Sequence, residues 1–141
     1  MSIIVATIPH ESIEAMLPFL LPFIERARSR GCDIPAERMI KAVIDRDALL
    51  WVASEDHRPL GVAITAMVEA PEPDKRALHV TVAGGFIGRK WINELRRVLR
   101  SFCEAEGSRL MTWRGRRGWA RFLKLAPIGF SEGLWIFEDR W

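Results

Sequence analysis

Apolar and polar residues change their spacing several times along the chain, and each change marks an expected element. Residues 2–8 are rich in Ile and Val, which predicts a first strand. From Ser12 the apolar positions recur at helical spacing, which predicts a helix that begins at Ser12 and ends at Gly31. We expect a kink or a restart at Pro18, because proline lacks the amide donor. A second helix is expected to begin near Pro35.

The middle of the chain has the pattern of consecutive strands. Residues 49–54 and 60–68 are apolar runs separated by a polar turn, and they predict an antiparallel hairpin. After a proline-broken loop, residues 77–82 resume as a strand. One face of this strand is expected to carry Leu78, Val80 and Val82, and the other His79 and Thr81.

The last third of the chain alternates helices with strands. A long amphipathic helix is expected after the glycines near residue 85, then a strand at 109–113, a short helix at 118–125 and a last strand at 134–137. Two strands joined by a helix are expected to be parallel neighbours, and the hairpins antiparallel. The sequence therefore predicts a single domain over residues 1–141, of α/β class (an α+β mixed sheet), with helices on both faces of the sheet.

Charge and cysteine usage narrow the function classes. Residues 89–124 contain eleven Lys or Arg and three Glu, which indicates an anionic partner such as a nucleotide cofactor, nucleic acid or an acidic protein surface. Cys32 and Cys103 are far apart and lack metal-ligand spacing, so we expect reduced thiols and no metal site. No signal peptide or membrane span is indicated, and a cytoplasmic location is expected.

Two stretches carry a family resemblance. The first is VAGGFIGRKWINELRRVL at 82–99, a glycine turn that opens a basic helix; the second is ARFLKLAPIGF at 120–130. With the order of elements, they resemble the GNAT family of N-acetyltransferases over most of the chain. In that family the backbone amides of this turn and the helix N-terminus hold the pyrophosphate of acetyl-CoA. The resemblance implies a GNAT-like acyl-CoA N-acyltransferase fold and acetyl transfer from acetyl-CoA to an amine. It implies cofactor binding by Val82, Gly84, Gly85, Phe86, Gly88, Arg89, Lys90 and Arg114.

The chain departs from the family pattern at functional positions. Ala83 stands where the family has Arg or Gln, and Phe86 where it has a middle glycine. Leu123 stands closest to a tyrosine that protonates the departing thiolate, and the chain contains no tyrosine. We therefore expect reduced or lost activity. The candidate bases are His79 and Glu69, and Cys103 is a candidate replacement acid.

Two other functions remain open. One is a catalytically inactive GNAT-like module, a virion or regulatory protein of the kind found in phages and prophages. The other is a small nucleic-acid-binding protein that uses residues 109–121, where Arg114, Arg116 and Arg117 lie between Trp113 and Trp119. In the alternative interpretation of that segment, the tryptophans anchor a solvated loop to the core. Trp135 and Trp141 near the C-terminus would suit a homodimer contact, and the alternative, which we favour, is that Trp141 folds back onto the core.

Overall fold

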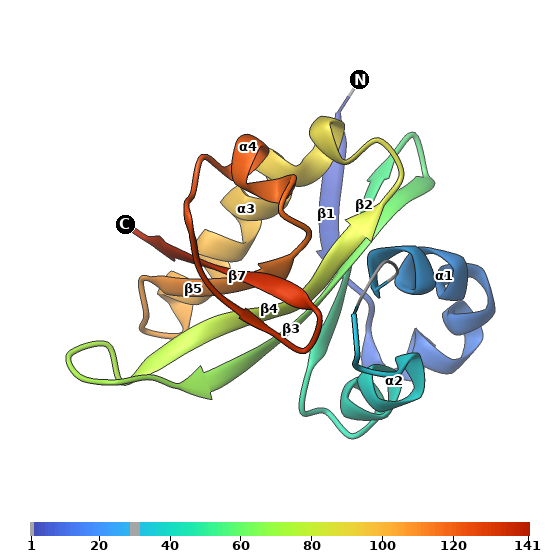
Figure 1. The fold of residues 1–141 in the computed structure, drawn as a ribbon. Coiled ribbons are helices and arrows are strands. Elements are labelled where there is room, and N and C mark those ends of the chain that lie inside the picture. Colours follow the sequence, from blue (N-terminus) through green and yellow to red (C-terminus); the bar gives the residue numbers. More distant parts are fainter. Residues whose placement is uncertain (1, 29–31) are drawn as a thin grey trace.

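The structure is a computed structural model that describes residues 2–28 and 32–141. These residues form one mixed sheet with helices on both faces (Figure 1). In chain order the elements are β1 (Ile3–Thr7), η1 (His10–Ser12), α1 (Ile13–Arg28), α2 (Ala36–Ile44), β2 (Leu49–Glu55), β3 (Arg58–Glu69), β4 (Arg76–Gly85), α3 (Gly88–Ala105), β5 (Leu110–Gly115), α4 (Trp119–Leu123), β6 (Pro127–Ser131) and β7 (Leu134–Arg140). The expected end of the first helix at Gly31 lies outside the described residues.

The strand pairing confirms the expected topology. The sheet order is β1-β2-β3-β4-β5-β7-β6, and β4 and β5 are parallel neighbours joined by α3. The other neighbouring pairs are antiparallel. The sequence pattern did not predict β6, because this edge strand is mostly exposed and lacks an alternating apolar face. Among the described residues, no helix has both the length and the apolar character needed to cross a bilayer.

Each face of the sheet has its own apolar core. On one face, α3 and α4 bury Trp91, Leu95, Leu99 and Leu123 against Leu78, Val80, Met111 and Trp113. On the other, α1 and α2 bury Leu20, Ile24, Met39 and Val43 against Leu50, Val62, Ile64 and Val82. The helices of the two halves therefore lie on opposite sides of β3 and β4, as Figure 1 shows.

A β-bulge in β4 overturns one sequence-based expectation. Ile64 pairs with Val82 and Thr65 pairs with Val80, so Thr81 is an extra residue in β4. Such a residue reverses the side-chain alternation beyond it. Val82 therefore packs on the α1 face, opposite to Val80, and the expectation that both share a face is wrong.

Helix α1 runs through both of its prolines as one element. Pro18 and Pro22 are exposed, so the carbonyls that lose an amide partner lie on the solvent side. Burial of Leu20 and Ile24 on the opposite side of the helix supplies the stabilisation. The helix is therefore not restarted at Pro18.

A buried charge cluster joins α3 to the last strand. Asp139 is 1% exposed and accepts two hydrogen bonds from Arg96, at 2.7 and 2.9 Å. Arg100 donates to the same carboxylate at 2.6 Å. The acid on β7 therefore holds both arginines against the sheet.

Candidate functional site

Helix α3 begins with main-chain donors that the protein does not use. The residue before it, Ile87, is in the left-handed region at φ 53° and provides no side-chain cap. The Lys90 amide donates to the Ile87 carbonyl at 2.9 Å. Within the described part of the chain, the amides of Gly88 and Arg89 have no acceptor. These amides lie at the positive end of an 18-residue helix, which favours an anion.

An open groove of about 600 Å³ lies at this helix start. Its lining consists of Ile87, Gly88, Arg89, Arg116, Gly118, Trp119 and Phe122. Arg89 and Arg116 give the groove positive charge, and the aromatic residues give it an apolar wall. This combination suits a ligand that has both phosphates and an apolar portion.

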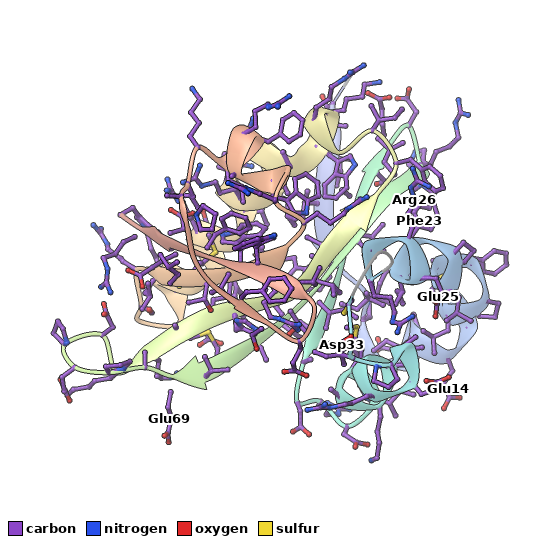
Figure 2. The ribbon with its side chains drawn as sticks, viewed as in Figure 1. Glu14, Phe23, Glu25, Arg26, Asp33 and Glu69 are labelled. Atoms are coloured by element: carbon purple, nitrogen blue, oxygen red, sulfur yellow. The ribbon has the colours of Figure 1, made fainter. Side chains whose placement is uncertain are left out.

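Phe86 lies outside this groove. Its ring packs edge-on against Phe23 of α1, with the centroids 5.5 Å apart, and the Arg26 guanidinium lies 4.3 Å from the ring centroid. Arg26 Nε also donates to the Gly85 carbonyl at 2.7 Å. Figure 2 labels Phe23 and Arg26 together on α1, beside the end of β4. Phe86 is therefore turned towards α1 and does not line the groove.

The glycines of the turn are required by protein contacts. A Cβ at Gly84 would lie 2.7 Å from the Ala27 Cα, and a Cβ at Gly85 would lie 2.3 Å from the Leu60 carbonyl oxygen. A Cβ at Gly88 would lie 2.5 Å from Cη2 of Trp119. Backbone packing and one tryptophan therefore explain these glycines before any ligand is considered.

Trp119 lies between the first residue of α3 and the last residue of β5. A Cβ on Gly115 would lie 2.2 Å from its Cδ1, and Gly88 meets the opposite edge of its ring. Near this ring the sheet opens, because the last β4–β5 pair is Val80 with Trp113. The two strands continue to Gly85 and Gly115 without pairing to each other.

The other residues expected to bind the cofactor lie apart from the groove. Lys90 Nζ contacts Glu55 Oε1 at 2.8 Å, which directs its charge to the β2–β3 turn. The Val82 side chain is fully buried beneath α1. Arg114 is on the α1 face of β5, since Met111 and Trp113 face α3. Of the predicted set, Gly88 and Arg89 line the groove.

The two candidate bases lie at different distances from the glycine turn. Glu69 is exposed at the end of β3, eight residues or about 26 Å along the strand from Gly61, which pairs with Gly85 at the glycine turn. Figure 2 shows Glu69 at the opposite end of the strand from Arg26. His79 lies on β4 one residue before the last β4–β5 pair, so of the two it is the one next to the opening.

His79 is neutral at physiological pH. Its Nδ1 lies 2.7 Å from the Thr112 hydroxyl on the neighbouring strand. Burial, with a smaller contribution from the positive charge of Arg114, lowers the pKa of His79 to about 4. The imidazole therefore accepts a proton only weakly near pH 7.

Neither the position of the missing tyrosine nor the candidate acid Cys103 lines the groove. Leu123, which stands closest to the tyrosine position, is fully buried in the core under α3. Cys103 is also fully buried, fifteen residues or about 22 Å along α3 from Gly88, and its thiol donates to the Leu110 carbonyl. Trp113 and Trp119 of the segment 109–121 are 1% and 8% exposed, so both anchor the core, and only a small exposed part of Trp119 lines the groove.

Sequence reasoning missed the contacts that α1 makes with the glycine turn. Phe23 and Arg26 lie one helical turn apart and converge on residues 85 and 86. Their spacing on one side of α1 is visible in the sequence, but it does not say which element they meet.

This architecture is the fold of the GNAT N-acetyltransferases. The sequence matches no protein-family model and no curated protein. Among solved structures, it is similar to a Drosophila melanogaster polyamine N-acetyltransferase that forms N-acetylagmatine, with a TM-score of 0.71, 15% identity, and 99% of this chain and 100% of that chain covered. A ribosomal-protein-alanine N-acetyltransferase from Brucella melitensis has a TM-score of 0.66 and 19% identity, with 92% and 96% covered. A predicted acetyltransferase from Clostridium acetobutylicum, solved with acetyl-CoA, has a TM-score of 0.63 and 10% identity, with 87% of each chain covered.

Proposed function

We propose that the chain binds acetyl-CoA in the groove at the start of α3 and transfers the acetyl group to an amine. The observation that carries this proposal is the pair of unused amides, at Gly88 and Arg89, facing a groove with basic side chains. Structures of the same fold that hold acetyl-CoA or coenzyme A support it. The amides and Arg89 and Arg116 would hold the phosphates.

The chain's own contribution to the chemistry would be mainly positioning. In the transfer, the amine nitrogen bonds to the thioester carbon, the carbon–sulfur bond breaks, and coenzyme A leaves as a thiol. With no tyrosine in the chain and Leu123 buried, the leaving sulfur would take its proton from water. His79 would act as a weak base, so the amine would lose its proton largely to solvent. We expect a slow enzyme whose rate rises with pH as the acceptor amine deprotonates.

Coenzyme binding tests the first half of this proposal. Titration with coenzyme A should raise the thermal stability, by about 2.7 kcal/mol at 100 times Kd. Arg89→Met should weaken binding about tenfold, because it removes a charge at the groove. Arg97→Met is the matched control, since Arg97 is on the same helix but pairs with the exposed Glu94. Absence of stabilisation by coenzyme A, or equal losses in the two variants, would contradict the proposal.

The inactive-module function is favoured by one observation: among the described residues, neither the tyrosine position nor the candidate acid Cys103 offers a proton donor to the groove. Leu123 and Cys103 are both buried away from it, and the tyrosine is missing. A thiol-release assay with acetyl-CoA and a broad set of amines separates the two functions. Binding of coenzyme A without turnover above the solvent rate would assign the chain to the inactive class.

A further inference from the structure

Arg114 is a buried cation that forms no ion pair with any described residue. It is 4% exposed, and its Nη2 donates to the main-chain carbonyls of Ser131 and Glu132, each at 3.0 Å. Its Nε is buried without a hydrogen-bond partner. Among the described residues, no carboxylate lies within 4.0 Å of its guanidinium, and the Glu132 carboxylate lies instead 3.8 Å from Arg38.

Three other arginines of the sheet and its helices are paired with acids. Arg96 and Arg100 share the buried Asp139 on the opposite face, and Arg140 pairs with Asp74. A buried charge without a counterion costs several kcal/mol. Two carbonyl contacts satisfy one nitrogen of Arg114 but do not neutralise its charge, which favours an anion supplied from outside the chain.

The position of Arg114 indicates which part of a ligand would carry this anion. It is the first residue of β5 beyond the last pair with β4, so it stands where the sheet opens. The alternation of β5 places it on the α1 face, away from the groove at the start of α3. The hydrogen bond from the Asp33 amide to the Glu132 carbonyl ties the β6–β7 turn above Arg114 to the segment before α2.

We infer that Arg114 binds the carboxylate of the acceptor, so that the acceptor is an amino acid or another amine that carries a carboxylate. This inference rests on the proposed acetyl transfer, because the amine and the thioester would meet at the opening from opposite faces of the sheet. A guanidinium recognises a carboxylate through charge-assisted hydrogen bonds, and the buried Nε of Arg114 is a donor left without a partner. The same charge repels polycations, so the acceptor class differs from the agmatine of the Drosophila enzyme.

Matched acceptors test the inference. The wild-type protein is incubated with acetyl-CoA and an equimolar pool of α-amino acids, the pool of their carboxamides, or agmatine, and products are followed by mass spectrometry. We expect at least tenfold faster acetylation of the acids. Arg114→Met should erase this preference by lowering the kcat/KM for acids 10- to 100-fold while changing that for carboxamides little. Arg114→Lys should restore part of it, and Arg97→Met should keep it.

Equal rates with acids and carboxamides, a preference for agmatine, or an equal loss for both pools in Arg114→Met would overturn the inference. The last result would mean that Arg114 only tethers the β6–β7 turn. Failure of the proposed function is seen separately, as the absence of stabilisation by coenzyme A.

A second measurement, on binding alone, needs no turnover. Arginine Nε–H resonances are recorded by NMR during titration with N-acetylglycine and with N-acetylglycinamide. One resonance should shift with the acid alone, and its absence from the Arg114→Lys spectrum assigns it. If no arginine resonance responds, or if both compounds act equally, Arg114 is not a carboxylate site.

Discussion

The contact between Gly88 and Trp119 predicts a measurable coupling. In Gly88→Ala the new methyl would lie 2.5 Å from Cη2 of the indole and 3.0 Å from Cζ3. The ring must move by about 1 Å to reach ordinary contact distance. It cannot move freely, because its other edge meets the backbone at Gly115. Overpacking of this kind costs about 1–3 kcal/mol, and the better helix propensity of alanine returns up to about 1 kcal/mol. We expect a net destabilisation of about 1–2 kcal/mol.

A double-mutant cycle with Trp119→Ala isolates this contact. In the Trp119→Ala background, itself destabilised by about 3 kcal/mol or more, Gly88→Ala should be neutral or slightly stabilising. Urea denaturation followed by far-ultraviolet circular dichroism gives the free energy of unfolding of all four proteins. An equal cost of Gly88→Ala in both backgrounds would refute the steric argument. Coenzyme A binding by the double variant then shows whether Gly88 is also needed by a phosphate.

Three further predictions concern charge. Asp139→Asn should lower the free energy of unfolding by about 3 kcal/mol, because it strands two arginines; Arg97→Met, with an exposed partner, should cost less than about 1 kcal/mol in the same denaturation experiment. Burial raises the pKa of Asp139 but the hydrogen bonds from its arginines outweigh it, so the net pKa is lowered and this stabilisation should be lost as pH falls through the acidic range, as acid titration of the circular dichroism would show. His79 has its pKa lowered from 6.5 to about 4, so its stabilisation is complete above pH 6.5 and falls towards pH 4; His79→Gln should flatten the stability–pH curve by about 1–2 kcal/mol between pH 7 and 5, and parallel curves would contradict this.

The periodicity of the sequence was enough to predict most of the fold. The helical spacing of Met39 and Val43 and the apolar runs of β2 and β3 report the burial that forms those elements. The failures occur where tertiary contacts decide. Pro18 is accommodated because its side of α1 faces solvent, and Val82 faces α1 because Thr81 is an extra residue in β4. Neither outcome leaves a local signal in the sequence.

The candidate site was predictable only in part. The glycine turn at 84–88 predicted the start of the helix that carries the unused amides. Arg89 lines the groove at this helix start, as its place in the motif predicts. The direction of Phe86 depends on α1, and the face of Arg114 depends on the register of β5 with β4. Residue type and spacing do not determine such long-range contacts.

The extra residue Thr81 in β4 bears on the opening between β4 and β5. Deleting it would leave β4 one residue shorter and regular, with Val80 and Val82 still on the opposite faces that they now occupy, and the strand would be straighter. A straighter β4 should continue to pair with β5 beyond Trp113 and close the opening between the two strands. The shortened protein should remain folded while losing the opening at which, in the proposed reaction, the amine and the thioester would meet.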